Sequence, residues 1–228
     1  MTFHIITILP NIFSPYFDES IIKRAQAAGI VKIKIYNLRD WAEDKHKTVD
    51  DTPYGGGAGM VIKIEPLYKA IITIKKKIKN KSVKTILLSA KGRTWNQKLA
   101  RAYSRQEHII LICGRYEGVD ERIINFVDEE ISIGDYILTG GEIPAMAIVD
   151  SVTRLLPGVL GNAESLRDES HSFPGYLSAP QYTRPEVFVD KDGREYPVPK
   201  VLLSGNHKEI KKWRQSQSKI RLEKNKNR

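Results

Sequence analysis

Short apolar runs alternate with longer amphipathic segments along the first two-thirds of the chain. The runs are rich in β-branched residues, as strands are, and lie at residues 3–9, 31–36, 85–88, 109–113 and 131–133. The segments between them have apolar residues at helical spacing and lie at residues 18–28, 65–78, 94–104, 119–126 and 142–156. This alternation predicts an α/β domain with a mostly parallel sheet over residues 1–160.

The composition changes after this domain. Residues 161–175 are rich in Asn, Ser, Asp, Glu and Gly, which predicts a linker or lid. In residues 176–228, apolar runs at 187–189 and 195–198 flank Asp192-Gly193, a dipeptide typical of hairpin turns. Asn206 with Glu209 resembles a capping box that opens a helix. We therefore predict a small, mainly helical C-terminal domain after the linker.

The chain is basic, and its charge is concentrated at one end. It has 37 Lys and Arg against 27 Asp and Glu, for a net charge of +10. Residues 204–228 hold 9 basic and 2 acidic side chains, so they supply +7 of that charge. A basic helix suits a phosphate backbone. A lysine-rich composition without a nucleic-acid partner explains the total charge equally well.

Several classes of protein are disfavoured. The single cysteine, Cys113, excludes an internal disulfide, and at the end of an apolar strand it indicates a buried thiol rather than a nucleophile. No apolar stretch approaches the ~18 residues of a membrane span. The N-terminus lacks the features of a signal peptide. These features favour a cytoplasmic protein with no membrane partner.

Three glycine-containing segments each follow a predicted strand, at residues 89–93, 113–118 and 133–141. Ligands of open α/β sheets bind at the carboxyl ends of the strands, where glycine lets the backbone approach closely. The pattern predicts a small-molecule pocket. The first strand lacks G-x-G-x-x-G after it, and the glycine-rich residues 55–60 lack the Lys-Ser/Thr ending of a P-loop.

Six motifs follow one another along nearly the whole chain: PYGGGAGM at 53–60, CGRYEGVDER at 113–122, SIGDY at 132–136, GGE at 140–142, YTRP at 182–185 and LSGNH at 203–207. Together they resemble the signature segments of bacterial tRNA (guanine-N1)-methyltransferases. The resemblance implies the SPOUT fold, whose sheet ends in a trefoil knot that binds S-adenosylmethionine. Periodicity alone does not predict a knot, because knots are rare exceptions to ordinary topology.

The resemblance also implies a substrate and an assembly. The substrate is tRNA, and the target is N1 of the guanosine immediately 3′ of the anticodon, position 37. The enzyme works as a homodimer whose active sites are shared between subunits, with Mg²⁺ as a further candidate cofactor. The residues that match the family's cofactor site are Ser89, Gly114, Tyr116, Glu117, Ile133, Gly134, Asp135, Tyr136, Ile137, Leu138, Gly140, Gly141 and Pro144.

Candidate contacts to tRNA lie in several parts of the chain. They are Asp50 before the glycine-rich segment, Ser170 in the linker, Arg184 in the YTRP motif, and His207, Lys211, Lys212 and Arg214 on the predicted basic helix.

Methylation of guanine N1 requires removal of its proton and stabilisation of the charge that develops at O6. The resemblance assigns the second role to Arg154 and the first to a linker carboxylate. Counting onto Ser170 puts Glu169 at the position of the base, and Asp168 takes that position if the register shifts by one. The ordinary alternatives are a surface pair between Asp150 and Arg154 and two solvated linker acids.

Two rival functions remain open at this stage. A SPOUT enzyme that methylates another RNA atom, such as a ribose 2′-hydroxyl, would not need the linker acid. A non-catalytic RNA-binding protein with the same fold would bind tRNA without binding S-adenosylmethionine.

Overall fold

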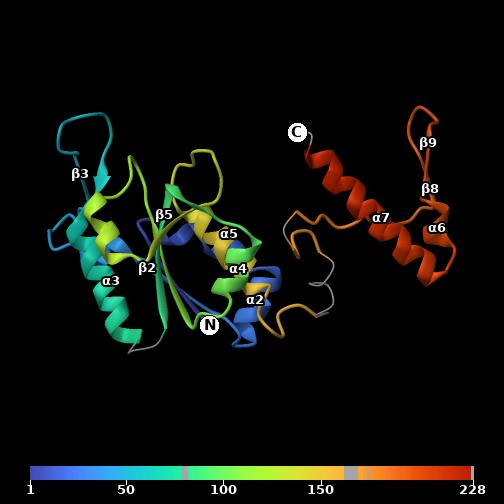
Figure 1. The fold of residues 1–228 in the computed structure, drawn as a ribbon. Helices are drawn as coiled ribbons and strands as arrows, with labels where there is room; N and C mark the ends of the chain where they lie inside the picture. Colours follow the sequence, from blue (N-terminus) through green and yellow to red (C-terminus); the bar gives the residue numbers. More distant parts are fainter. Residues whose placement is uncertain (79–81, 162–168, 174, 227–228) are drawn as a thin grey trace. The chain divides into compact units, whose positions relative to one another are not determined.

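The chain divides into two compact units, Met1–Gly161 and Asn162–Arg228. The computed structural model describes residues 1–78, 82–161, 169–173 and 175–226 (Figure 1). None of the described helices is long and apolar enough to cross a membrane.

The first unit contains a five-stranded sheet in which every pair of neighbours is parallel, with the order β2-β1-β6-β5-β7. The five predicted strands all coincide with strands of this sheet, which confirms the predicted parallel α/β architecture. The strands are β1 (Thr2–Thr7), β2 (Lys32–Asn37), β5 (Val83–Thr94), β6 (His108–Cys113) and β7 (Glu129–Ser132).

Strand β5 is longer than its apolar run predicts. It continues beyond residue 88 to Thr94, and its register against β7 shifts between Leu88 and Arg93. A Cβ at Gly92 would lie only 2.4 Å from the backbone nitrogen of Ile131. The extension therefore depends on a glycine that lets β5 approach β7 closely.

Alternate residues of the central strands face two apolar layers, as expected of a sheet that is covered on both faces. Ile5 and Ile86 point into one layer, and Ile6 and Leu87 into the other. Helices α2 (Ser20–Ala27), α4 (Gln97–Tyr103) and α5 (Glu142–Thr153) cover the first layer (Figure 1). Helix α3 (Ile64–Ile78) covers the second with the 3₁₀ helices η2 (Leu38–Trp41) and η3 (Glu121–Phe126).

Several short elements were not predicted. They are η1 (Pro10–Ile12), α1 (Ser14–Phe17), η2 and an antiparallel pair, β3 (Asp50–Asp51) with β4 (Val61–Ile62). Elements of two to four residues are too short to show a periodic pattern. The segment predicted as a helix at 119–126 is the 3₁₀ helix η3, whose first turn is capped by the Asp120 side chain.

The second unit contains a hairpin followed by two helices. Strands β8 (Val187–Val189) and β9 (Glu195–Pro197) are antiparallel, and Gly193 in their turn has a φ of 79°. Helices α6 (Lys200–Leu203) and α7 (His207–Lys226) follow. The Asn206 side chain accepts a hydrogen bond of 3.3 Å from the backbone nitrogen of Glu209, so both the predicted turn and the predicted cap are present.

A buried histidine lies within the sheet of the first unit. His4 on β1 is 3% exposed. Its Nδ1 lies 3.1 Å from the hydroxyl of Tyr36, and its Nε2 lies 3.1 Å from Nδ1 of His108. Burial, together with the positive charge on His108 and Lys34, lowers the pKa of His4 to about 4. The folded protein therefore holds this imidazole neutral in mildly acidic solution.

This histidine should make stability depend on pH. Between the folded pKa of about 4 and the ordinary value of 6.5, the unfolded chain binds more protons than the folded one. We expect the free energy of unfolding to fall as pH is lowered from 7 to 4, by at most about 1.4 kcal/mol per pH unit for this group. His4→Gln should show a shallower fall in denaturant titrations. Identical pH profiles for the two proteins would contradict this assignment.

Candidate functional site

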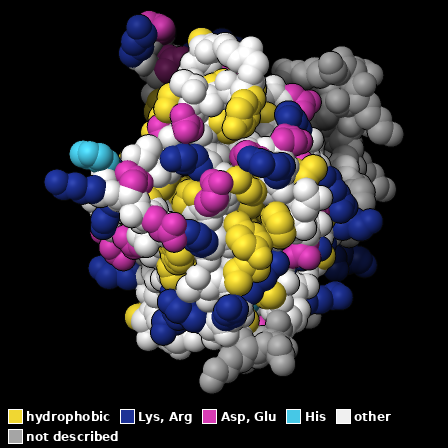
Figure 2. All heavy atoms as spheres, turned by 90° about the vertical axis from the view of Figure 1, so that its left-hand side faces the viewer, with side chains coloured by type: hydrophobic (Ala, Val, Ile, Leu, Met, Phe, Trp, Pro, Cys, Tyr) yellow, Lys and Arg dark blue, Asp and Glu magenta, His cyan; other side chains and the backbone are white. Residues whose placement is uncertain are grey.

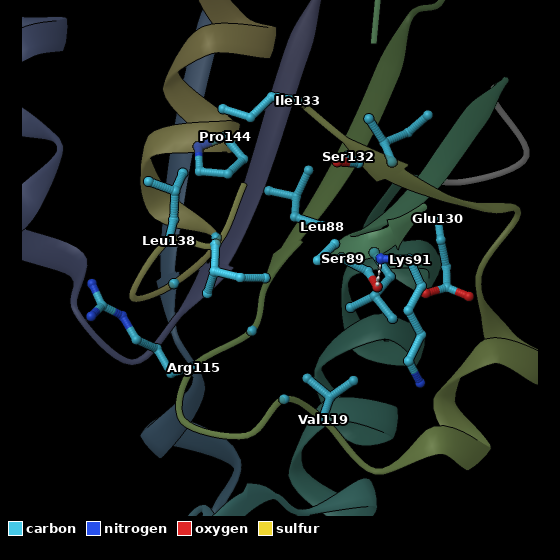
Figure 3. Close-up of a pocket in the computed structure, with 18 of the residues that line it drawn as sticks. Leu88, Ser89, Lys91, Arg115, Val119, Glu130, Ser132, Ile133, Leu138 and Pro144 are labelled. Atoms are coloured by element: carbon cyan, nitrogen blue, oxygen red, sulfur yellow. Dashed lines mark hydrogen bonds between the residues drawn. The ribbon is translucent and has the colours of Figure 1, made fainter. Parts of the chain in front are cut away.

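A pocket of about 390 Å³ opens beside the second half of β5 and at the carboxyl ends of β6 and β7 (Figure 3). It is lined by residues 87–91 of β5, residues 114–119 and 121 after β6, residues 130–134 and 136–141 at and beyond β7, and Pro144 of α5. The three glycine-containing segments, which are far apart in the sequence, therefore meet at one cavity.

The structure brings together nearly all of the predicted cofactor residues. The exception is Asp135, whose exposed side chain is not among those that line the pocket. The role of the others in binding stays a prediction. The residues that line the pocket are Ser89, Gly114, Tyr116, Glu117, Ile133, Gly134, Tyr136, Ile137, Leu138, Gly140, Gly141 and Pro144.

The two sides of the pocket differ in character. Ile133, Leu138 and Pro144 give one side an apolar surface (Figure 3). Ser89 and Lys91 lie on the other, where the Ser89 hydroxyl accepts a 3.2 Å hydrogen bond from the backbone nitrogen of Lys91 (Figure 3). The pocket thus offers an apolar surface for a flat ring and polar groups for a hydrophilic end.

Close contact between backbones shapes this pocket. The backbone nitrogen of Gly141 donates a 2.9 Å hydrogen bond to the carbonyl oxygen of Gly114. A Cβ at Gly141 would lie 2.7 Å from the Cα of Cys113, and one at Gly140 would lie 2.3 Å from Nε of Arg115. The contact at Gly141 is the stricter one, because backbone atoms cannot rotate away as a side chain can.

Gly141→Ala should therefore destabilise the protein, by about 1–3 kcal/mol, the usual cost of overpacking. The comparison is Gly161→Ala, since a Cβ at Gly161 would meet nothing within 4 Å. Denaturant unfolding of the two variants measures the difference. Equal stability of Gly141→Ala and Gly161→Ala would show that the segments around Gly114 and Gly141 can move apart without loss of folding free energy.

A buried ion pair connects the pocket to β1. The Glu142 side chain is 1% exposed, and its Oε2 lies 3.0 Å from Nε of Arg115. Its Oε1 accepts a 2.8 Å hydrogen bond from the hydroxyl of Thr7, and Arg115 also donates to Thr139 at 3.4 Å. Because a buried charge is retained only when it is paired and hydrogen-bonded, this network fixes the first turn of α5 beside the pocket.

Sequence reasoning missed the contribution of these groups. Arg115 lies in a motif that was recognised, but it was not selected as a site residue. Thr7 carries only a weak signal, as a polar residue at the end of an apolar strand. Thr7 lies 135 residues before its partner Glu142, and Arg115 lies 27 residues before it.

Cys113 is buried at the end of β6 beside this network. Burial and the negative charge of Glu142 raise the pKa of its thiol well above its ordinary value. The thiol is therefore held protonated and inaccessible, which agrees with the structural role predicted for it.

The predicted catalytic residues fall in different units. Arg154 caps the C-terminus of α5 in the first unit and does not line the pocket. Glu169 belongs to the second unit, where its carbonyl oxygen accepts a 3.1 Å hydrogen bond from the backbone nitrogen of Ser172. Asp168 lies outside the described residues.

The other residues predicted to contact tRNA are also divided between the units. Asp50 pairs with Ile62 in the β3–β4 pair of the first unit. In the second unit, the Ser170 hydroxyl accepts a 3.0 Å hydrogen bond from the backbone nitrogen of Ser178. Arg184 and Arg214 line a surface hollow with Tyr182, and His207, Lys211 and Lys212 are exposed on α7.

Comparison with known proteins gives one consistent family. The model of the family "tRNA (Guanine-1)-methyltransferase TrmD" matches residues 1–228. A tRNA (guanine-N(1)-)-methyltransferase of Dictyoglomus turgidum is 56% identical over 94% of this chain and 83% of its own length. One of Clostridioides difficile is 53% identical over 98% of this chain and 94% of its own. The similarity therefore extends over both units.

Proposed function

Because the chain belongs to the tRNA (guanine-1)-methyltransferase family, it is an S-adenosylmethionine-dependent tRNA methyltransferase that acts on guanine N1, and we propose that its target is the guanosine immediately 3′ of the anticodon. The observation that carries the proposed site is the meeting at one pocket of part of β5 with the segments that follow β6 and β7. The two segments after β6 and β7 contain the CGRYEGVDER, SIGDY and GGE motifs.

We propose that this pocket binds S-adenosylmethionine, which supplies an electrophilic methyl group on its sulfonium. The apolar side formed by Ile133, Leu138 and Pro144 fits the adenine ring (Figure 3). Backbone groups of Gly134 and Gly140 offer hydrogen bonds at close range, since no side chain intervenes. The Glu117 carboxylate lines the same cavity and complements a positive charge.

The chemical step requires two protein groups. Glu169 removes the N1 proton of guanine, and Arg154 donates hydrogen bonds to O6, where negative charge develops. S-adenosylmethionine, when bound, would supply the methyl group that N1 accepts once its proton has passed to Glu169. No nucleophilic side chain takes part in this step.

A trefoil knot is the proposed topology of the first unit. Helix α5 follows β7, which lies at one edge of the sheet, yet it packs against β1 and β6 in the middle. On this return path Gly140 pairs with Arg115, and Gly141 bonds to Gly114. These contacts support passage of residues 133–141 through the loop after β6.

A homodimer is the proposed assembly. Ile143 and Ala147 form an exposed stripe along α5 that continues to Arg154, beside the exposed Tyr16, whose hydroxyl donates to Asp150. An apolar stripe that leads to a catalytic arginine suits burial against a second copy. Sedimentation velocity tests this proposal, and a monomeric mass at micromolar concentration would contradict it.

For the second unit we propose a role in binding tRNA. Residues 1–160 form the catalytic domain, and residues 161–175 form a linker that carries the proposed general base, Glu169. Residues 176–228 form a tRNA-binding domain. The exposed cations of α7 and the two arginines of the surface hollow support this division. We also propose that the enzyme works in the cytoplasm, where its tRNA substrate is found.

Mg²⁺ is proposed as an additional ligand of the pocket. The carboxylates of Glu117, Glu121 and Glu130 line it, and Mg²⁺ prefers oxygen ligands. Among the described residues no three potential ligands are grouped for a metal. The ion would therefore retain several waters beside one or two carboxylates, as Mg²⁺ commonly does.

The test of the proposed function compares two tRNA transcripts, with guanosine or adenosine after the anticodon. We expect labelled methyl groups to be transferred only to the first, and nucleoside mapping to find them on N1 of guanine. Equal transfer to both transcripts would refute the proposed target. A ribose-methylated product would favour a SPOUT enzyme of different specificity, and tRNA binding without methyl transfer or S-adenosylmethionine binding would favour the non-catalytic alternative.

A further inference from the structure

The loop between β3 and β4 carries an exposed aromatic side chain, Tyr54, directly followed by three glycines. Tyr54 has a relative exposure of 103%, so the fold buries none of its ring. The next residues include Gly55, Gly56 and Gly57, all with positive φ, and a Cβ at any of the three would meet nothing within 4 Å. Residues 55–59 therefore expose mainly backbone atoms, because Ala58 carries their only side chain.

The base of this loop is attached to the proposed cofactor site. The backbone nitrogen of Glu117 donates a 3.0 Å hydrogen bond to the carbonyl oxygen of Met60, and Ile62 bonds to Gly118 at 3.0 Å. A Cβ at Gly59 would lie 2.7 Å from Cγ of Glu117. The loop thus leaves the first unit beside a segment that lines the pocket.

A cation beside the base of the same loop also suits an RNA ligand. Arg122 lies on η3, and Asp120 just before it donates a 2.9 Å hydrogen bond from its backbone nitrogen to the carbonyl oxygen of Ile62 on β4. The Arg122 guanidinium is held by Asp120, with Nε–Oδ1 and Nη2–Oδ2 distances of 2.9 and 2.6 Å, and the arginine side chain remains 67% exposed. Surfaces that bind single-stranded nucleic acid commonly combine exposed cations with exposed aromatic rings, and this part of the first unit offers one of each.

The proposed reaction creates a need for such a ring. Guanine N1 lies on the edge that pairs with another base, so the reactive guanine must be unpaired and separated from its stacked neighbours. Proteins that bind unpaired RNA replace lost base stacking with aromatic side chains. We propose that Tyr54 stacks on an unpaired base of the tRNA beside the site of methyl transfer. This inference rests on the proposed function and adds a positioning residue to it.

The test measures transfer kinetics and stacking separately. Tyr54→Ala should lower kcat/KM for tRNA by about 5- to 150-fold, the range expected from loss of one base–aromatic stack, with little change in KM for S-adenosylmethionine. Tyr54→Phe and Tyr54→Trp should restore most of the activity, because they keep a ring. A transcript with 2-aminopurine at the target or at a neighbouring nucleotide should show fluorescence quenching by the wild type that is reduced by Tyr54→Ala.

Tyr68 provides a matched control. It lies on α3 and packs against Phe126 with a centroid distance of 4.7 Å. Apolar side chains also gather among Lys and Arg on the face of the molecule that Figure 2 shows. Tyr68→Ala should leave tRNA kinetics near the wild type.

Two results would overturn the inference. One is a Tyr54→Ala enzyme within twofold of the wild type in both assays, and the other is a Tyr54→Phe enzyme as defective as Tyr54→Ala. The fluorescence assay needs no methyl transfer. A wild type that fails to methylate would therefore count against the proposed function, while fluorescence would still decide the role of Tyr54.

Discussion

Glu169→Gln is expected to reduce the rate of methyl transfer by about 10²- to 10⁴-fold, the usual contribution of a general base. Glutamine keeps the size of the side chain but does not accept the N1 proton. Affinity for S-adenosylmethionine, measured by calorimetry, should remain within about twofold, because Glu169 is proposed to act only on the guanine of the tRNA.

The neighbouring acid provides the matched comparison. Asp168→Asn should keep most of the activity, since the alignment onto Ser170 assigns the base to Glu169. The opposite pattern, with Asp168→Asn inactive and Glu169→Gln active, would shift the assignment by one residue. Two active variants would mean that neither carboxylate is the base.

Arg154→Ala is expected to lower kcat by about 10²- to 10³-fold, the cost of removing one hydrogen-bond donor from a developing oxyanion. Arg154 does not line the proposed cofactor pocket, so S-adenosylmethionine should bind with nearly unchanged affinity. Arg154→Lys should recover part of the rate, because it restores the charge without the planar pair of donors.

A surface arginine supplies the control for this substitution. Arg24 is exposed near the end of α2, and Arg24→Ala should retain the wild-type kcat. If Arg154→Ala instead raised KM for S-adenosylmethionine and left kcat unchanged, Arg154 would belong to cofactor binding. A variant with wild-type kinetics would leave Arg154 with no part in the reaction.

Predictions from the sequence were most accurate for features that depend on few consecutive residues. Apolar runs located the strands of the main sheet most clearly at its centre, because side chains of the buried strands β1, β5 and β6 are apolar on both faces. The turn at Gly193 and the cap at Asn206 were found for a similar reason, since a backbone angle or one side chain determines each. The ends of β5 and the short β3–β4 pair lacked such local signals.

The candidate site was predicted in a different way. Its residues were assigned from motifs, and the structure brings all but Asp135 of the predicted cofactor residues to one cavity. Arg115 and Thr7 were not predicted, because neither their type nor their spacing indicates the shared carboxylate of Glu142.

The sequence by itself determined the alternation of strand and helix, the position of the basic helix and the family to which the chain belongs. These depend on side-chain periodicity, local backbone preferences and the order of motifs. Only the tertiary structure decided how residues 89, 114 and 141 shape the pocket predicted for them, that the Glu142 carboxylate pairs with Arg115, and that Tyr54 is left exposed. Such contacts depend on strand order and on the close approach of distant backbones, which no short stretch of sequence specifies.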